Sequence, residues 1–404
     1  MDDKSVLIFG AGKIGRSFIG QLFGFAGYQV VFVDVDPDVV RELNIRKSYP
    51  VVIKGKTDEV IVVPNVRAVS GLDNSAVIHE ISTASLMAVS VGKNALEKII
   101  PRIAEGLLLR NEKYPNWPLD IIIAENMRSA AIFIYNTLTE ILPKNYPIDN
   151  LVGLVETSIG KMVPIMTEED LKEDPLLIFA EPYNTLILDK RGFKGPIPNV
   201  PGLSPKDNIK AWVDRKAFIH NMGHASAAYF GNYFHPEANF IYEVLQDNKV
   251  FSATRNAMMQ AANVLIRFYP GDFSLNDLEL HVDDLLSRFQ NRALKDTVFR
   301  VGQDLPRKLG INDRFAGIIQ MAMNAGMPYN LILEAMAFGF FFSKSDEQGN
   351  FNTQDVLFTN HLKEKGVENT LVSLCGFSQE KDRLLIDELK VEYLNLKQSG
   401  KKSI

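Results

Sequence analysis

Residues 5–34, which read SVLIFGAGKIGRSFIGQLFGFAGYQVVFVD, decide the fold of this chain. The first five of them form an apolar run, which predicts a strand that is buried on both faces. A glycine-rich turn at 10–15 follows, and residues 16–26 predict a helix. A second apolar run, at 30–33, predicts the next strand. Strand, glycine turn, helix and strand in this order are typical of a dinucleotide-binding βαβ unit.

Each glycine of this turn has a mechanical reason to be a glycine. Gly10 makes the tight turn, Gly12 lets the backbone approach a pyrophosphate, and Gly15 lets the helix pack closely on the strand. The start of the helix then offers free N–H groups and a positive dipole to the phosphates. Lys13 and Ile14 lie between these glycines, and we expect both to contact the cofactor as well.

Asp34 ends the second apolar run, nineteen residues after Gly15. A carboxylate at this position accepts hydrogen bonds from the hydroxyls of an adenosine ribose. A 2′-phosphate would meet a negative charge there, and the sequence has no Arg or Lys between Asp34 and Arg41. We therefore predict NAD rather than NADP as the cofactor.

The composition is that of an ordinary soluble globular protein, with 46% hydrophobic and 23% charged residues. At 404 residues the chain is long enough for two or three domains. Its formal net charge of −5 gives no reason to expect nucleic acid or an anionic membrane as a partner. Cys375 is the only cysteine, which excludes an internal disulfide and fits a reducing cytosol. We expect a cytoplasmic protein without a signal peptide or membrane span, because no apolar stretch reaches about 18 residues.

The first half of the chain alternates strand-like and helix-like stretches, which predicts a parallel sheet with crossover helices. The predicted strands include residues 60–63, 77–81, 119–123, 152–155 and 186–188. Helices are predicted to begin near Ala95 and near Ser129.

Glycines and prolines crowd residues 192–205, a composition that cannot continue a helix or a central strand. Beyond this segment apolar residues recur at spacings of three and four, which predicts helices at residues 251–269, 313–325 and 331–342. We therefore predict an α/β Rossmann-like N-terminal domain with a parallel sheet at residues 1–195. A mostly α-helical C-terminal domain, which carries the substrate and catalytic groups, is predicted at residues 196–404.

Residues 215–224, which read RKAFIHNMGH, bring a base, an amide and imidazoles together. In an α-helix, at about 100° per residue, Lys216, Asn221 and His224 fall within an arc of about 140°. Such a set suits proton abstraction from a hydroxyl: the lysine takes the proton, the amide stabilises the oxyanion, and the imidazole holds a neighbouring hydroxyl. The same residues are also compatible with a helix that carries a solvated lysine and two ordinary histidines.

Five groups of motifs occur in one order along nearly the whole chain. They are Gly10–Arg16 with Phe18–Gly20, Ala124–Met127, Phe193–Gly195 with Pro198–Gly202, Arg215–His224 with Ala228–Gly231, and Arg288–Asn291, Lys295–Thr297 and Arg307–Leu309 with Asp313–Arg314. With these motifs the chain resembles the long-chain polyol-specific (mannitol) dehydrogenases, a metal-independent family, and within it the mannitol-1-phosphate 5-dehydrogenases. The resemblance implies NAD-dependent, reversible oxidation of mannitol 1-phosphate to fructose 6-phosphate.

Carried over position by position, the resemblance implies that Lys216 is the general base. It implies that Asn126 and Asn221 stabilise the oxyanion, and that His224 binds a substrate hydroxyl. A lysine acts as a base at neutral pH only if its pKa falls below the reference value of about 10.4, and burial or the oxidised nicotinamide would lower it. The hydride passes between the substrate carbon and the nicotinamide ring. Asn126 also follows a predicted buried strand, so its side chain is equally compatible with a cap on the next helix.

Four cations fall within fifteen residues of the second predicted domain: Arg300, Arg307, Lys308 and Arg314. Guanidinium groups and an ammonium group suit a phosphate monoester, so we predict that these residues bind the phosphate of a sugar or polyol phosphate. They are also compatible with solvated surface cations that pair with Asp304 and Asp313.

The sequence departs from the family pattern at three positions. Gly160 and Lys161 stand where the family typically has an aspartate and an arginine, which leaves substrate preference open. Lys93 follows Val91 and Gly92 at a position where family members commonly have proline. Val91 itself is predicted to contact the cofactor.

Three other functions remain compatible with the sequence. The first keeps the mechanism and changes the substrate: a mannitol 2-dehydrogenase or a hexuronate (tagaturonate or fructuronate) reductase of the same superfamily. The second is a non-catalytic NAD-binding sensor, which would have no need of Lys216. A zinc enzyme could use His220 and His224, which are four residues apart, but no third ligand is obvious, and we predict no metal. The sequence does not determine the oligomeric state.

Overall fold

A computed structural model of the protein describes residues 4–55, 57–125, 127 and 129–400. The chain divides into two compact units, Met1–Val213 and Asp214–Ile404. This division falls later than the predicted boundary between residues 195 and 196. The reason is that strand β11 (Leu203–Lys206) pairs in parallel with β10 (Leu186–Asp189) and so belongs to the first unit.

The first unit is built on an eight-stranded sheet with the order β11-β10-β8-β7-β6-β1-β2-β5. Its other strands are β1 (Ser5–Phe9), β2 (Gln29–Asp34), β5 (Val66–Ser70), β6 (Leu86–Val89), β7 (Leu119–Ile123) and β8 (Val152–Ser158). The six neighbouring strands β8, β7, β6, β1, β2 and β5 are all parallel, and β10 runs antiparallel to β8. The predicted parallel sheet is therefore confirmed.

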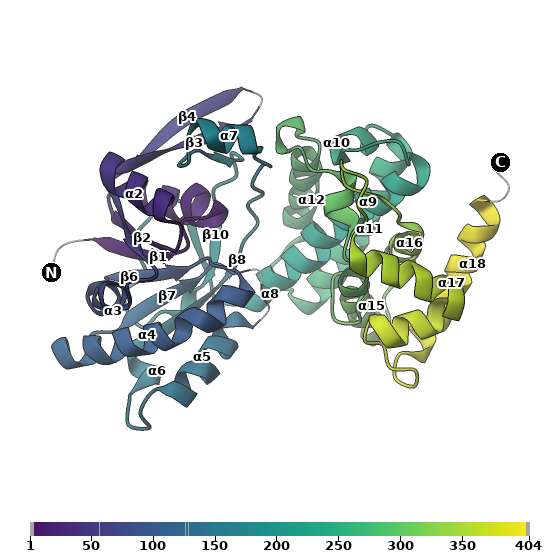
Figure 1. Ribbon diagram of the computed structural model, residues 1–404. Helices are drawn as coiled ribbons and strands as arrows, with labels where there is room; N and C mark the ends of the chain where they lie inside the picture. The colour runs from purple at the N-terminus through teal and green to yellow at the C-terminus, as the bar shows by residue number, and fades with distance from the viewer. Residues whose placement is uncertain (1–3, 56, 126, 128, 401–404) are drawn as a thin grey trace. The chain divides into compact units, whose positions relative to one another are not determined.

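Both faces of this sheet are covered, as the unbroken apolar strands predicted. In β1, Val6 and Ile8 point into one buried cluster, which also contains side chains of α2 (Pro37–Arg46). Leu7 and Phe9 point into a second cluster on the other face. That second face is covered by α3 (Asn74–Thr83), α4 (Lys93–Lys113), α5 (Ala130–Ile141) and α6 (Ile148–Leu151), and Figure 1 shows α3, α4 and α5 together below the sheet.

The predicted strand at residues 77–81 is wrong, because this segment lies in helix α3. The side chain of Asp73 caps the helix by accepting a hydrogen bond of 3.0 Å from the N–H of Ala76. Val77 and Ile81 are four residues apart and therefore share one face of the helix, where both are fully buried. A short segment with apolar residues is compatible with a strand or with a buried helix, and here the N-terminal cap favours the helix.

A three-stranded sheet with the order β4-β3-β9 packs beside the main sheet in the first unit. It consists of β3 (Ser48–Lys54), β4 (Asp58–Pro64) and β9 (Ile178–Ala180), and the short helix α7 (Glu168–Glu173) precedes β9. The predicted strand at residues 60–63 is confirmed in β4.

The second unit is almost entirely helical, as predicted. After α8 (Ile209–Arg215), which starts before the division, its helices are α9 (Met222–Phe234), α10 (Ile241–Val244), α11 (Asn248–Phe268), α12 (Leu275–Phe289), α13 (Val298–Gly302), α14 (Leu305–Lys308), α15 (Ala316–Asn324), α16 (Asn330–Phe338), α17 (Thr353–Leu374) and α18 (Arg383–Gly400). Helix α9 is the most deeply buried, because small residues let its neighbours approach. A Cβ added at Gly223 would lie only 2.4 Å from the sulfur of Met258 on α11.

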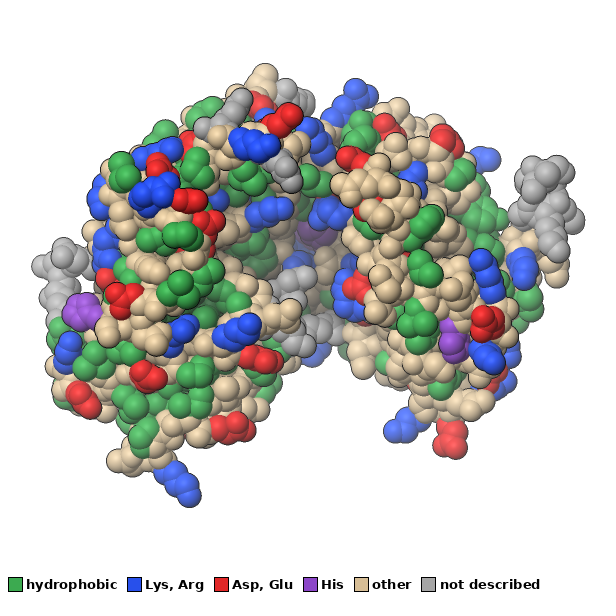
Figure 2. Space-filling model, viewed as in Figure 1, with side chains coloured by type: hydrophobic (Ala, Val, Ile, Leu, Met, Phe, Trp, Pro, Cys, Tyr) green, Lys and Arg blue, Asp and Glu red, His purple; other side chains and the backbone are tan. Residues whose placement is uncertain are grey.

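On the face seen in Figure 2, Lys and Arg side chains are interspersed with Asp and Glu side chains over each unit. Within residues 4–400, as far as they are described, no helix is long and apolar enough to cross a bilayer.

Candidate active site

The glycine turn of the first unit has the close contacts that its sequence predicted. Gly10 has a φ of +93°, and a Cβ added to it would lie 2.6 Å from the carbonyl oxygen of Ser90. A Cβ on Gly15 would lie 1.9 Å from the carbonyl oxygen of Gly10. Gly12, in contrast, faces open space on the outside of the turn. Two glycines thus close the turn, and the third leaves its backbone accessible to a pyrophosphate.

The carboxylate of Asp34 lies beside this turn at the carboxyl end of β2. One of its oxygens accepts a hydrogen bond of 2.6 Å from the N–H of Ala11, and the other accepts one of 3.0 Å from the N–H of Asp36. The buried Arg16 donates from Nε to the carbonyl oxygen of Ala11 at 2.6 Å. The turn is therefore held from both sides. The other two predicted contacts differ in burial: Lys13 is exposed and Ile14 is half-buried.

A second loop, between β6 and α4, joins the glycine turn at the same edge of the sheet. The side chain of Val91 would lie 3.3 Å from a Cβ on Gly10. The carboxylate of Glu125, at the end of β7, accepts hydrogen bonds from the N–H groups of Val91 (2.7 Å) and Gly92 (3.0 Å). Burial raises the pKa of Glu125 above its ordinary value, and these two backbone donors oppose that shift.

Glu125 is a residue that the sequence reasoning passed over. The signal was present, because an acidic residue directly after a buried strand needs hydrogen-bond donors nearby. Asn126, the predicted oxyanion donor next to it, lies outside the described residues.

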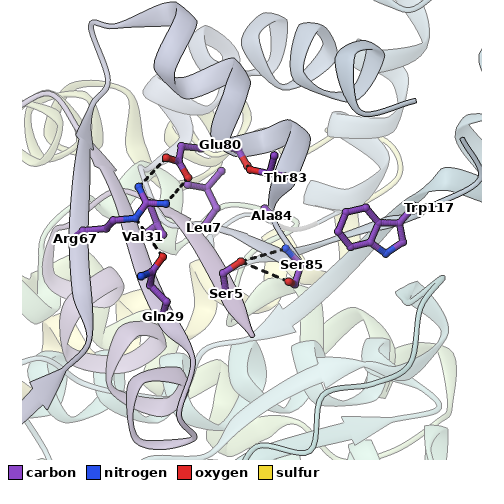
Figure 3. A pocket seen from close by; sticks show the side chains of 10 residues that line it. All are labelled: Ser5, Leu7, Gln29, Val31, Arg67, Glu80, Thr83, Ala84, Ser85 and Trp117. Carbon is purple, nitrogen blue, oxygen red and sulfur yellow. Dashed lines mark hydrogen bonds and ion pairs between the residues drawn. The ribbon is translucent and has the colours of Figure 1, made fainter. Parts of the chain in front are cut away.

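A pocket of about 250 Å³ lies at the opposite edge of the sheet, where the parallel strands begin (Figure 3). Ser5, Gln29 and Arg67 stand at or near the first positions of β1, β2 and β5. The guanidinium of Arg67 donates two hydrogen bonds of 2.7 Å to Glu80 and one of 3.2 Å to Gln29. Because these polar groups already bind one another, the pocket is a poor receptor for a cofactor.

In the second unit, the predicted catalytic segment is a π-helix and not the α-helix that the sequence reasoning assumed. The π-helix covers Lys216–Asn221, and the N–H of Met222 donates to the carbonyl oxygen of Ala217, five residues earlier. A π-helix has more residues per turn than the 3.6 of an α-helix, so Lys216 and Asn221 lie closer together around the helix axis than they would in an α-helix. In an α-helix the two residues would have diverged by about 140°.

Lys216 has the electrostatic character of a base. Burial, and then the positive charge of Arg314, lower the pKa of Lys216 from 10.5 to about 8. Arg314 itself donates from Nε to Asp313 at 2.7 Å and from Nη1 to the carbonyl oxygen of Asn221 at 3.3 Å. Its guanidinium is thus fixed next to the Lys216–Asn221 helix.

His224 follows on α9 and is held among buried groups. Its ring stacks on Phe289 with centroids 4.3 Å apart and planes 5° from parallel. Its Nε2 lies 3.4 Å from a carboxylate oxygen of Asp296. The ring centroid of His220 lies 5.6 Å from that of the same Phe289 ring, with the two planes tilted by 56°. Among the described residues, no group of three or more His, Cys, Asp or Glu side chains could hold a metal ion.

The four predicted phosphate-binding cations do not form one cluster of free charges. Burial lowers the pKa of His224 well below its ordinary value, and the positive charges of Arg300, Lys308, Arg314 and Arg288 act in the same direction. Arg300 is connected to His224 through Asp296, which pairs with Arg300 and lies 3.4 Å from Nε2 of His224. Arg307 is half-exposed and pairs with Asp304 and, at 3.7 Å, with Asp313, the carboxylate that also pairs with Arg314.

Arg300, Arg314 and Lys308 each have a partner within the unit. Arg300 pairs with Asp296, and Arg314 with Asp313. The buried ammonium of Lys308 donates to the carbonyl oxygen of Val301 at 2.6 Å. Burial is the main cause that lowers the pKa of Lys308 from 10.5 to about 7.

The departure from the family pattern at residues 160 and 161 lies in the first unit. The ammonium of Lys161 is buried and donates to Asn184 at 2.9 Å and to Gln21 at 3.4 Å. It also lies 5.1 Å from the centroid of the Phe18 ring. Lys161 thus ties the segment after β8 to the helix that follows the glycine turn.

Comparison with known proteins places these features in a family. The model of the mannitol dehydrogenase Rossmann domain matches residues 4–202, and that of the mannitol dehydrogenase C-terminal domain matches residues 208–382. The structure is similar to that of a D-sorbitol dehydrogenase in substrate-free form, with a TM-score of 0.81, 15% identity and coverage of 98% of this chain and 94% of that one. It is also similar to Pseudomonas fluorescens mannitol 2-dehydrogenase in a ternary complex with NAD and D-mannitol, with a TM-score of 0.76, 14% identity and coverage of 99% and 93%.

These solved structures share the fold, and the two domain models together span most of the sequence. The glycine turn, the carboxylate of Asp34 and the accessible backbone of Gly12 fit a bound dinucleotide. The chain therefore belongs to the mannitol dehydrogenase family and is an NAD-dependent oxidoreductase that acts on a CH–OH group.

Proposed function

We propose that the protein catalyses the reversible, NAD-dependent oxidation of mannitol 1-phosphate to fructose 6-phosphate. The observation that supports this most is the composition of one region of the second unit. There, a lysine with a lowered pKa lies on the same short helix as an amide, and the charges of Arg300, Lys308 and Arg314 lower the pKa of the imidazole that follows them. A proton acceptor for an alcohol and positive charge for a phosphate thus come from a single packed unit.

In the proposed mechanism, Lys216 accepts the proton of the alcohol as the oxidation proceeds. The amide of Asn221 donates a hydrogen bond to the oxygen that is losing this proton, and Asn126 is proposed as a second donor. His224 binds a neighbouring hydroxyl and so orients the substrate. NAD, when bound, supplies the acceptor of the hydride. In the reverse direction the ammonium of Lys216 returns the proton to the ketone oxygen.

The residues proposed to hold NAD are those of the two loops at the carboxyl edge of the sheet. The backbone of Gly10, Gly12 and Gly15, with the adjoining Lys13 and Ile14, would hold the pyrophosphate. Asp34 would accept the ribose hydroxyls. Val91 packs against the glycine turn and would line the cofactor.

Arg300, Lys308 and Arg314 are the proposed receptor of the substrate phosphate, because their charges act on His224. Arg307 is assigned a smaller part, since it is half-exposed and pairs with both Asp304 and Asp313. A phosphate would compete with the internal carboxylates for the guanidinium groups, and two charge-assisted hydrogen bonds of about 1.5–3 kcal/mol each would favour it.

One observation favours a second candidate, a mannitol 2-dehydrogenase. Arg300, Arg307 and Arg314 all pair with carboxylates of the same unit. A receptor whose charges are already balanced also suits an uncharged polyol. A hexuronate reductase remains a third possibility on the same chemistry.

A comparison of fructose 6-phosphate with fructose as substrates of NADH oxidation separates these functions. We expect kcat/KM to be at least about 100-fold higher for the phosphate ester, from about 3 kcal/mol of added binding. Arg300→Ala and Arg314→Ala should raise the KM for fructose 6-phosphate and leave that for NADH unchanged. Arg255→Gln, which removes an arginine paired with Glu279 and Asp283 on α11 and α12, is the control.

Equal efficiency with fructose would contradict phosphate recognition and assign the protein to the second candidate. Activity restricted to tagaturonate or fructuronate, included in the same screen, would assign it to the third.

A further inference from the structure

Asp296 and His224 face each other inside the second unit, although 71 residues lie between them along the chain. Asp296 Oδ2 and His224 Nε2 are 3.4 Å apart, and the side chains are 5% and 13% exposed. Both atoms are buried, and among the described residues neither has a hydrogen-bond partner of good geometry. A buried acceptor and a buried ring nitrogen that face only each other need a proton between them.

The carboxylate of Asp296 is fixed from the other side. Its Oδ1 pairs with Arg300, one helical turn further along the chain. The backbone oxygen of Asp296 accepts a hydrogen bond of 2.9 Å from the N–H of Ile241, and the next residue, Thr297, caps α13. Asp296 therefore cannot turn its Oδ2 elsewhere without breaking its contact with Arg300.

The imidazole of His224 is equally constrained. The stack on Phe289, at 4.3 Å and nearly parallel, fixes the plane of the ring. Burial, followed by the charges of Arg300, Lys308 and other cations, lowers the pKa of His224 well below its ordinary value. The ring is therefore neutral near pH 7 and carries a single proton, on either Nε2 or Nδ1. Only a proton on Nε2 can be donated to Asp296.

We propose that Asp296 is a positioning residue, which holds the proton of His224 on Nε2 and so leaves Nδ1 as a hydrogen-bond acceptor. His224 then accepts a hydrogen bond from a substrate hydroxyl and does not donate one. The statement about the hydroxyl rests on the proposed function, whereas the position of the proton does not. The same carboxylate holds Arg300, so one residue couples the recognition of a hydroxyl to a cation of the proposed phosphate receptor.

The Asp296→Asn variant gives a specific expectation. Arg300 offers only donors, so the carboxamide oxygen stays with Arg300 and the NH₂ group replaces Oδ2 opposite His224. A donor at that place requires Nε2 to be an acceptor, which moves the proton of His224 to Nδ1. His224 would then present a donor to the substrate hydroxyl, and kcat/KM for the sugar substrate should fall about ten- to hundredfold.

The experiment is ¹⁵N NMR of the full chain with labelled histidine, in which His224→Gln assigns the His224 signals. The wild type should show the proton on Nε2, and Asp296→Asn should show it on Nδ1. Arg300→Gln should weaken sugar binding but leave the proton on Nε2, which separates the two contacts of Asp296.

Asp247→Asn is the matched control, because Asp247 pairs with His235 at 2.6 Å in the same unit. Asparagine also caps helices, so α11 keeps its N-cap. This control should change the His235 signals only and leave kcat/KM unchanged.

A wild-type His224 that carries its proton on Nδ1 would overturn the proposal, and this measurement needs no variant of Asp296 to fold. An unchanged tautomer in Asp296→Asn would overturn it as well. A proton on Nε2 in an enzyme that does not reduce fructose 6-phosphate would support the positioning role while it removes the proposed substrate.

Discussion

The pH dependence of alcohol oxidation should report the pKa of Lys216. Burial and the charge of Arg314 lower this pKa from 10.5 to about 8. At pH 7 a pKa of about 8 leaves about one lysine in ten uncharged, whereas 10.5 would leave about one in 3,000. The environment of Lys216 thus raises the uncharged fraction of this lysine about 300-fold at neutral pH.

The pH dependence of kcat/KM has opposite signs for oxidation and for reduction. Oxidation needs the uncharged amine, so kcat/KM should rise about tenfold per pH unit below pH 8 and level off above it. Reduction needs the ammonium, so it should be constant at low pH and fall above pH 8. The assay is initial-rate spectrophotometry of NADH from pH 6 to 10, in both directions. An inflection near pH 6 would come from the second ionisation of the phosphate ester, and unphosphorylated mannitol serves as the control for it.

Two variants test whether the inflection belongs to Lys216. Lys216→Ala should lose about 10²- to 10⁴-fold in kcat and its pH dependence near 8, while NADH still binds. Arg314→Gln should move the inflection to higher pH, because one of the two causes of the lowered pKa is removed. A wild-type profile that is flat from pH 6 to 9, or a Lys216→Ala variant that keeps the inflection, would refute the assignment of the base.

Three further predictions concern the two units separately. Gly15→Ala places a methyl group 1.9 Å from the carbonyl oxygen of Gly10, so NADH binding measured by fluorescence should be lost, and near-normal affinity would contradict the tight turn. Asp34→Ser should shift cofactor preference from NAD toward NADP in kcat/KM, and an unchanged ratio would show that this carboxylate does not select the cofactor. Lys216→Met should increase the free energy of unfolding at pH 7 by up to about 3 kcal/mol, because the folded state disfavours the charged lysine below pH 8. In urea titrations this gain should shrink between pH 8 and pH 10.5, where the lysine becomes uncharged in both states, and a gain that is independent of pH would contradict the cause.

The fold of the first unit could be predicted because its signals are local. Four consecutive apolar residues in β1, Val6 to Phe9, alternate between two buried clusters, and the glycine turn follows directly. The error at residues 77–81, which read VIHEI, arose because five residues are too few to show a period, and the capping residue Asp73 was the signal that could have corrected it.

Some of the ion pairs that the cations form could also be predicted from the sequence. Asp296 and Arg300 are four residues apart, and Asp304 and Arg307 are three apart, which are the spacings of ion pairs on a helix. The contact between Asp296 and His224 could not be predicted, because it joins segments that meet only when α9 and α13 pack together. Long-range contacts of this kind leave no trace in the spacing of residues along the chain.

The type of helix at the site is the feature that was hardest to predict from the sequence. Two π-helices occur in the described chain as single turns: Gly15–Gly20 begins at the last glycine of the predicted cofactor turn, and Lys216–Asn221 contains two of the predicted catalytic residues. A π turn differs from an α turn by one residue and by no change in composition, so hydrophobic periodicity cannot reveal it. Because a π turn holds more residues than an α turn, Lys216 and Asn221 diverge by less than the 140° that an α-helix would impose. The proposed roles of Lys216 as base and Asn221 as oxyanion donor require both side chains to reach one substrate oxygen, and the smaller divergence favours this arrangement.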